Sequence, residues 1–406
     1  PPANAPVVLT GMENGRDTQM KQQLGTKYVS QRYRLRWWFP EDTTYRNLTF
    51  TGIVQGLLDA RVRNKLWRYL MYRETPSALG STDFMMFVRR DLAYGPWAAP
   101  QADTQTPDET VYTTKARTIA ATSIFGFPGN GNGQFQQPKG MALGPDGNLY
   151  VADSQNHRIE VVTPTGQFVR AWGTKGKDPG QFNEPWGVAV SPQGMVYVAD
   201  TWNHRVQEFS TDGKFIRTWG GQPDGGPHSE DGQFFGPRAI AIDSAGNVYV
   251  TDTGNKRIEK FTADGAFISS IGGPGSGAGF FNEPVGLAFD QSGNLFVADA
   301  WNQRVQKFGP DLKPISSFPV AAWDSQSVVD KPFLTVDSAD NVYVSDPQNG
   351  RIIEFNAAGQ LFALWGLIGT DQSSFRLPTG LVVDATGSVF VSDSDNNRIM
   401  KFAPIK

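Results

Sequence analysis

The sequence predicts a mainly β protein: a six-bladed β-propeller closed by a strand from before its first repeat and preceded by a small α/β domain. The first observation is a ten-residue motif that recurs six times, beginning with "VADSQNHRIE" at 151–160. The Asp of this motif stands at 153, 200, 252, 299, 346 and 393, in steps of 47, 52, 47, 47 and 47 residues. A repeat of this length is typical of propeller blades, each a sheet of four short antiparallel strands.

The fourth repeat shows the strands most clearly. Short apolar or alternating segments occupy 285–290, 294–299, 304–309 and 314–318, and turn residues separate them. Alternation of apolar and polar residues over about five positions, bounded by Gly, Pro, Asn and Asp, indicates β-strands joined by tight turns. The repeat therefore predicts one four-stranded blade.

The last repeat is incomplete. It ends at "RIMKFAPIK" (398–406) without an outer strand, and a segment that resembles the missing strand, "TSIFG" (122–126), precedes the first repeat. We expect residues 119–126 to pair with 398–403 and complete blade six, because closure removes the exposed edges of an open ring.

The region before the repeats has a different pattern. Residues 1–98 are predicted as a small α/β domain, 99–117 as a linker and 118–406 as the propeller. Strands are expected at 5–11, 30–40 and 81–92, and helices at 17–25 and 50–74. Strands that alternate with helices favour a parallel sheet.

Composition limits the possible functions. The chain has no Cys, which excludes disulfides, Cys-ligated zinc and a thiol nucleophile. Residues 121–406 carry 21 Lys and Arg against 29 Asp and Glu, a charge of −8, whereas residues 1–120 carry +5. An acidic repeat region is a poor match for nucleic acid. No apolar run reaches the roughly 18 residues of a transmembrane helix.

Each motif Asp is followed five residues later by an Arg. A catalytic group is needed once, so six copies indicate a structural pair, in which the Asp caps the turn after strand two and the Arg folds back onto it. The predicted pairs are Asp153–Arg158, Asp200–Arg205, Asp252–Arg257, Asp299–Arg304, Asp346–Arg351 and Asp393–Arg398.

Large apolar residues also recur. A proline precedes the first strand of each repeat, and we call it the repeat proline. The side chain three residues before it is expected to pack between adjacent blades, as are the Trp side chains that end the outer strands. These positions are Phe135, Phe182, Phe234, Phe281, Val329 and Phe375, with Trp172, Trp219 and Trp365.

Other positions vary within the fixed frame. They follow each repeat proline by one residue, or each motif Asp by two or four, and are expected to share one loop-bearing face. Exposed aromatic residues beside amides and charges suit a glycan or a protein partner. The predicted rim is Lys139, Gln155, His157, Trp186, Trp202, His204, Arg238, Lys256, Trp301, Gln303, Phe333 and Gln348.

The recurring residues resemble NHL-repeat six-bladed β-propellers. The pattern is P-x-G-[VIL]-A, then [NS]-[VL]-[YF]-V-[AST]-D-x-x-N-x-R-[IV], then G-x-F and W-G, over about 290 residues. Blade five departs most, with "KPFLTVDSADN" at its start. The resemblance implies the fold; functions in the family range from scaffolds and RNA binders to a few enzymes.

Residues 33–42 ("YRLRWWFPED") and 87–92 ("FVRRDL") resemble the soluble tail of bacterial membrane glycosyltransferases of the dolichyl-phosphate-mannose-utilising kind. That resemblance implies a location outside the cytoplasm, and proximity to a membrane through an upstream segment. Because catalysis in such enzymes lies mostly in membrane segments, no catalytic residue carries over.

We therefore expect an extracytoplasmic binding or scaffold protein, with no catalytic residue, cofactor or metal assigned. His228, Glu230 and Asp231 in the loop 220–237 are a weak candidate metal site, because a Gly-rich loop is poorly preformed. The alternatives are a lyase or hydrolase centred in the propeller channel, and a self-assembling surface or fibre component. Zinc lyases of the NHL group use several histidines, whereas this chain has three.

Overall fold

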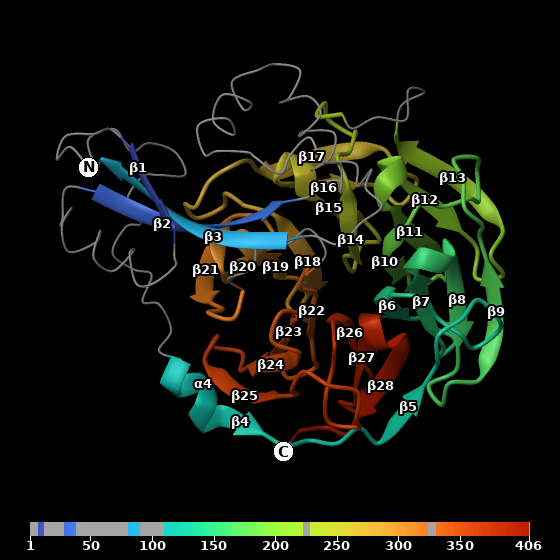
Figure 1. The fold of residues 1–406 in the computed structure, drawn as a ribbon. Coiled ribbons are helices and arrows are strands. Elements are labelled where there is room, and N and C mark those ends of the chain that lie inside the picture. The colour runs from blue at the N-terminus through green and yellow to red at the C-terminus, as the bar shows by residue number, and fades with distance from the viewer. Residues whose placement is uncertain are drawn as a thin grey trace, which may run out of the picture. The chain divides into compact units, whose positions relative to one another are not determined.

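The computed structural model describes residues 7–11, 28–37, 80–89, 109–221, 228–323 and 330–405. The chain divides into two units, Pro1–Ala99 and Pro100–Lys406. Figure 1 shows the strands of both units.

The first unit contains a three-stranded sheet of β1 (Val7–Gly11), β2 (Tyr28–Trp37) and β3 (Gly80–Arg89), in the order β1-β3-β2. The three predicted strands are present, but both pairings are antiparallel, so the predicted parallel sheet is wrong. Apolar alternation is the same in both kinds of sheet, and it does not determine strand direction. The helices predicted at 17–25 and 50–74 lie outside the described residues.

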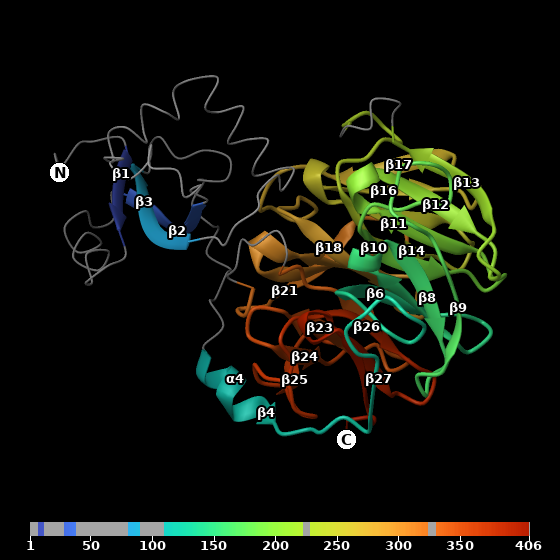
Figure 2. The same cartoon turned by 45° about the vertical axis from the view of Figure 1, so that its right-hand side comes forward.

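The second unit is a ring of six sheets, each with four strands of one blade running from the axis to the outer wall (Figures 1 and 2). The predicted mainly β, six-bladed propeller is confirmed. The inner strands, which begin at the repeat proline except in blade five, are β6 (Pro138–Leu143), β10 (Pro185–Val190), β14 (Pro237–Ile242), β18 (Pro284–Phe289), β22 (Leu334–Val336) and β26 (Pro378–Val383).

The next two strands of each blade form a tight hairpin that is mostly buried on both faces. The second strands are β7 (Leu149–Asp153), β11 (Val196–Asp200), β15 (Val248–Asp252), β19 (Leu295–Asp299), β23 (Val342–Asp346) and β27 (Val389–Asp393). The third strands are β8 (Arg158–Val162), β12 (Arg205–Phe209), β16 (Arg257–Phe261), β20 (Arg304–Phe308), β24 (Arg351–Phe355) and β28 (Arg398–Phe402).

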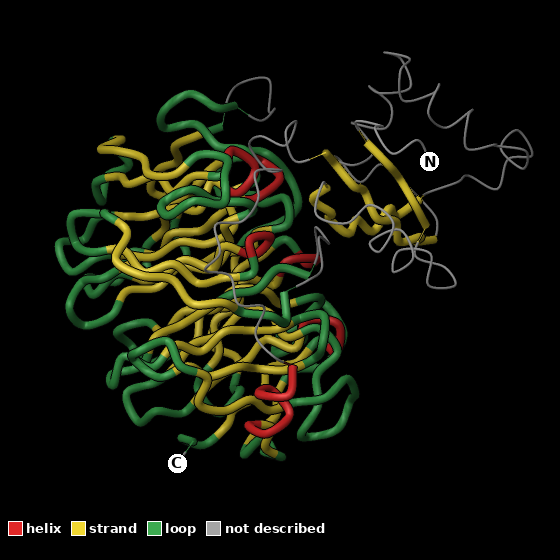
Figure 3. Tube along the Cα trace, turned by 90° about the vertical axis from the view of Figure 1, so that its left-hand side faces the viewer, coloured by secondary structure: helices red, strands yellow, loops and turns green. Residues whose placement is uncertain are grey.

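In five blades a 3₁₀ turn joins the second strand to the third, and Figure 3 shows the helical turns, in red, on one side of the propeller. These turns are η6 (Ser154–Asn156), η7 (Thr201–Asn203), η8 (Thr253–Asn255), η9 (Ala300–Asn302) and η10 (Ser394–Asn396). The outer strands are β9 (Phe168–Trp172), β13 (Phe215–Gly220), β17 (Phe267–Gly272), β21 (Pro314–Pro319) and β25 (Leu361–Trp365), with β5 (Ser123–Phe125) in blade six.

The ring closes between its two ends. Strand β5 pairs antiparallel with β28, with Phe125 opposite Ile399 and Ser123 opposite Lys401. The predicted closure by residues 119–126 is confirmed, and the N-terminal strand supplies the outer strand that the last repeat lacks.

Blade five carries an additional strand. Helix α4 (Glu109–Lys115) leads into β4 (Ala116–Arg117), which pairs in parallel with β25. The Tyr112 hydroxyl accepts a hydrogen bond from the Ala321 backbone N–H at 3.2 Å, and the Arg351 guanidinium lies 5.4 Å from the Tyr112 ring. The second half of the predicted linker 99–117 is therefore part of the propeller, anchored by one buried aromatic side chain.

The core consists of apolar clusters between neighbouring sheets. Phe182 is fully buried between blades one and two, and its ring lies 5.5 Å from that of Phe209. Gly173 follows the outer strand with φ of 104°, and a Cβ there would lie 2.5 Å from the Phe182 ring. This contact explains the W-G ending, since only Gly fits that backbone under the wedging Phe. Of the predicted wedge positions, Val329 lies outside the described residues.

Candidate binding face

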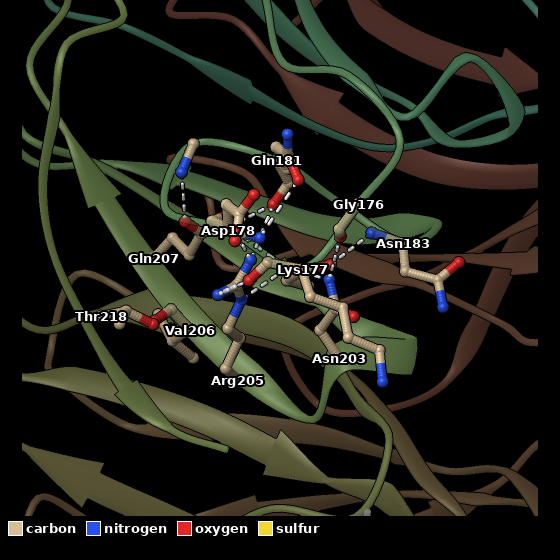
Figure 4. Close-up of polar contacts among 12 residues, drawn as sticks. Gly176, Lys177, Asp178, Gln181, Asn183, Asn203, Arg205, Val206, Gln207 and Thr218 are labelled. Atoms are coloured by element: carbon tan, nitrogen blue, oxygen red, sulfur yellow. Dashed lines mark hydrogen bonds and ion pairs between the residues drawn. The ribbon is translucent and has the colours of Figure 1, made fainter. Parts of the chain in front are cut away.

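The motif Arg ties the strand hairpin to the loop before the inner strand. In blade two, Arg205 Nε donates to Asp200 Oδ2 at 2.7 Å. Its two terminal nitrogens donate to the backbone carbonyls of Lys177, Asp178 and Gln181 at 2.7 to 3.0 Å (Figure 4). One guanidinium therefore holds a Gly-rich loop by its backbone, whatever the loop's side chains are.

The motif Asp holds the same loop from the other side. Asp200 Oδ1 accepts the backbone N–H of Asn183 at 2.7 Å, and Oδ2 accepts the side-chain amide of Asn203 at 2.8 Å. No side-chain capping hydrogen bond reaches the following 3₁₀ turn. In five blades the predicted role as a cap of its own turn is wrong, because the carboxylate accepts a backbone N–H of the preceding loop. In blade five Asp346 Oδ1 accepts the backbone N–H of Asn349 in its own turn at 3.4 Å, as predicted.

All six Asp–Arg pairs are present, with Nε–Oδ2 distances of 2.6 to 2.8 Å. Every motif Asp is buried. Burial raises the pKa of Asp252 and of Asp346 to about 6, although the paired Arg and other hydrogen-bond donors oppose the rise. The repetition of one geometry around the ring supports a structural role.

The residues that follow the repeat prolines meet near the propeller axis. A Cβ on Gly140 would lie 2.5 Å from the Trp186 carbonyl oxygen, and one on Gly187 would lie 2.4 Å from that of Arg238. The inner strands therefore approach closely at this end, and their side chains fill the space between them. Consequently Lys139, Trp186, Arg238 and Phe333 are 1 to 7 % exposed, and the prediction that they form an exposed rim is wrong.

Cations cover the Trp rings at this end of the axis. The Arg238 guanidinium lies 3.9 Å from the centre of the Trp186 ring, and Lys139 Nζ lies 4.9 Å from it. Lys331 Nζ lies 4.6 Å from the Trp301 ring and 2.9 Å from Glu283 Oε2. Burial lowers the pKa of Lys331, and Glu283 opposes that effect.

Sequence reasoning missed Lys331 and Glu283. They stand directly before the repeat prolines, where the residue also varies from blade to blade. A comparison of the six repeats would have found this position, because its residue differs between blades while the proline that follows it is constant. The residues there are Gln137, Glu184, Gly236, Glu283, Lys331 and Leu377.

The positions four after the motif Asp connect adjacent blades. His157 Nδ1 accepts the backbone N–H of Glu184 at 3.1 Å, and His204 Nδ1 accepts that of Gly236 at 3.0 Å. Lys256 donates to the Asn282 side chain at 3.0 Å. These three predicted rim residues are bound to the next blade instead of pointing away from the ring.

The remaining predicted rim residues stay at the surface. Trp202, Trp301, Gln155 and Gln348 are half-buried, and Gln303 is exposed. We call these five, together with the half-buried Glu184 and Glu283, the loop face. The Trp202 indole N–H donates to Glu184 Oε2 at 3.2 Å, which fixes the edge of that ring.

A cavity of about 280 Å³ is lined by the turns after the inner strands of blades four, five and six. It contains Asp290, Asp337 and Asp384, and each of these accepts backbone hydrogen bonds from its own turn. Across the described residues, no group of three or more His, Cys, Asp or Glu side chains is placed to hold a metal ion.

The family model for the NHL repeat matches residues 135–162, 182–209, 234–261, 281–308 and 375–402. Five of the six blades therefore contain an NHL repeat. Blade five of this NHL propeller has no match, in agreement with its short inner strand and its additional strand.

Solved structures similar to the NHL propeller include a streptogramin B lyase, at 14 % identity over 66 % of this chain and 93 % of that one, with a TM-score of 0.47. A gluconolactonase from Xanthomonas campestris has 14 % identity over 67 % of this chain and 88 % of that one, with a TM-score of 0.50. Likeness at this identity shows the fold alone. No curated protein matches the sequence, and none of the comparisons supports the glycosyltransferase-tail resemblance. Within the described part of the chain, no helix is long and apolar enough to cross a membrane.

Proposed function

We propose that the NHL propeller is a non-catalytic binding module whose loop face holds a glycan. The observation that supports this proposal is the pair Trp202 and Trp301, which stay half-buried at the surface while the other rim aromatics are buried. Aromatic rings with an apolar body and a polar edge suit surfaces that are partly wet.

The surroundings of the two rings favour a ligand rich in hydroxyl groups. Glu184 and Glu283 supply carboxylate oxygens beside the Trp rings, and Gln155, Gln303 and Gln348 supply amide donors and acceptors on neighbouring turns. Planar polar groups of this kind donate to and accept from sugar hydroxyls. The motif Asp–Arg pairs, which we call the framework, hold the loops beside these turns by backbone hydrogen bonds, so the loop face is preorganised before a ligand binds.

A glycan array with the full chain tests the proposal. Trp202→Ala with Trp301→Ala is expected to abolish the glycan signal without a change in melting temperature beyond that of the control. The control is Phe215→Ala, which removes a 36 % exposed aromatic ring from the outer strand β13. Array binding that survives the double substitution, or no glycan binding by the unsubstituted chain, refutes the proposal.

The competing function is a hydrolase or lyase reaction at the other end of the propeller. It is favoured by the cavity between the turns of blades four to six. Lactone hydrolysis that is lost on Asp337→Asn and retained in the Trp variants would establish it. Self-assembly is the third possibility, and sedimentation of the purified chain over a range of concentrations tests that.

A glycan-binding role is consistent with a location outside the cytoplasm, where most glycans are found. We propose that location, with membrane proximity supplied by an upstream segment of a glycosyltransferase-like protein. Cell fractionation and protease accessibility in the native host test the location. A cytoplasmic location would refute both the location and the glycosyltransferase link.

A further inference from the structure

Two of the three histidines in the chain hold blade two to its neighbours. His157, from blade one, accepts the backbone N–H of Glu184 at the entry to blade two. His204, from blade two, accepts the backbone N–H of Gly236 at the entry to blade three. Both histidines have left-handed backbone conformations with φ of 54°, which direct the ring across the blade boundary.

These hydrogen bonds need a neutral imidazole. Nδ1 accepts a hydrogen bond only when its proton is absent, and in the protonated ring both nitrogens are donors. A protonated His157 would therefore place an N–H against the Glu184 N–H, and His204 would do the same at Gly236. Because two N–H donors would then face each other, the hydrogen bond is lost and the partly buried backbone N–H has no acceptor.

Other blade boundaries use side chains other than imidazole. Asn397 Oδ1 accepts the backbone N–H of Gln137 at 2.8 Å, between blades six and one. Lys256 donates to Asn282 between blades three and four. Asn397 occupies the same position of the repeat as the two histidines. Its amide oxygen accepts the hydrogen bond at any pH, so this blade boundary shows what a His→Asn substitution would produce.

We propose that His157 and His204 form an acid-sensitive latch: protonation in mildly acidic solution releases the entry segments of blade two and blade three from the ring. The released segments carry Glu184 and Trp186 in blade two and Arg238 in blade three. The latch goes beyond the proposed glycan binding, since it concerns the joints of the ring and is measured without a ligand.

The surroundings of His157 favour the neutral form. Burial lowers the pKa of His157 most, the nearby Lys175 lowers it further, and Glu184 opposes both. His204 is 2 % exposed, and its ring packs edge-on against Phe235 at 5.8 Å. Because the opened latch binds a proton more readily than the closed one, closure is complete above the ordinary His pKa of 6.5 and weakens as the pH falls.

Amide hydrogen exchange, resolved by residue with NMR, tests the latch in the full chain. From pH 7.5 to 5.5 the protection factors of the Glu184 and Gly236 amides are expected to fall by up to about tenfold, because one histidine holds each amide and linkage gives at most tenfold per pH unit below the ordinary His pKa of 6.5. The Gln137 amide, held by Asn397, is the internal control and is expected to keep its protection. Equal behaviour of the three amides overturns the proposal.

Single substitutions assign the effect. His157→Asn is expected to remove the pH response at Glu184 alone, and His204→Asn that at Gly236 alone, as Asn397 predicts. His228→Asn, in the loop before blade three, is the matched control and leaves both responses in place. A pH response that persists at Glu184 in folded His157→Asn protein also overturns the proposal, whatever the outcome of the glycan array.

Discussion

Replacement of Glu160 by Gln is expected to stabilise the propeller at neutral pH. Glu160 stands two residues after the motif Arg, where blade two has Gln207. Gln207 accepts the Gly180 N–H at 2.9 Å and donates to the Gln181 carbonyl at 2.7 Å. Gln207 also donates to the motif Asp of its own blade at 3.1 Å.

The glutamate has only part of this network. Its Oε1 accepts the Gly133 N–H at 2.7 Å. Its Oε2 forms an ion pair with the Arg158 guanidinium and has no other partner within the described structure. A carboxylate lacks the N–H groups with which Gln207 donates to the loop carbonyl and the motif Asp. In blade three, Glu259 Oε1 takes both the Gly232 N–H at 3.0 Å and the Arg257 guanidinium at 3.2 Å, and Oε2 has no hydrogen-bond partner among the described residues.

The magnitude follows from the titration of the two carboxyl groups. Burial is the main cause that raises the pKa of Glu160 and of Glu259 from 4.5 to about 7. One pKa unit corresponds to about 1.4 kcal/mol, so each ionised glutamate costs about 3 kcal/mol of folding free energy above pH 7. The folded state binds the extra proton between pH 4.5 and 7, so this cost is absent below 4.5 and complete above about 7.

Urea unfolding at pH 4.5 and pH 8 measures the difference. Glu160→Gln is expected to add about 2–3 kcal/mol to the free energy of unfolding at pH 8 and little at pH 4.5. Gln207→Glu is the reverse control and is expected to destabilise at pH 8 alone. An effect of Glu160→Gln that is independent of pH, or a loss of stability at pH 8, would refute the reasoning.

The remaining predictions concern the frame of the propeller and are measured by urea or thermal unfolding. Arg304→Ala leaves a buried carboxylate unpaired and is expected to cost about 3 kcal/mol. Gly187→Ala places a Cβ 2.4 Å from the Arg238 carbonyl oxygen and is expected to cost about 1–3 kcal/mol. Tyr112→Ala removes the anchor of the additional strand on blade five, at about 3 kcal/mol. Deletion of 118–126 exposes the edge of β28 and is expected to lower the melting temperature; an unchanged value would contradict the closure.

The fold could be predicted because each blade repeats the same local rules. The fixed period and strand alternation determine the four strands, and the truncated last repeat indicates which segment closes the ring. The antiparallel sheet of the first unit could not be predicted, because alternation along β1 and β2 carries no information on strand direction. Helix α4 was missed because the segment around the buried Tyr112 is mostly polar and has the composition of a linker.

The loop face could be predicted only in part. Variation within a fixed frame identifies positions with no role in the repeat, and Trp202 and Trp301 were found in this way. Burial of Trp186 depends on the distance between inner strands, which is set by the close approach at Gly187 and was not visible in the sequence. The contact of His157 with the next blade depends on its left-handed backbone, which several residue types adopt in this chain.

The framework explains why the loop face is free to vary. Arg205 and Asp200 bind the preceding loop through the backbone carbonyls of Lys177 and Gln181 and the N–H of Asn183. Backbone atoms are present whatever the side chain, so these hydrogen bonds impose no residue type on the loop apart from its glycines. A substitution at the turn apex, such as Gln155 in place of the Trp202 of the next blade, leaves this framework unchanged. The side chains of the loop face can therefore change from blade to blade without loss of the hydrogen bonds that stabilise the ring. A surface that acquires new ligands needs this freedom.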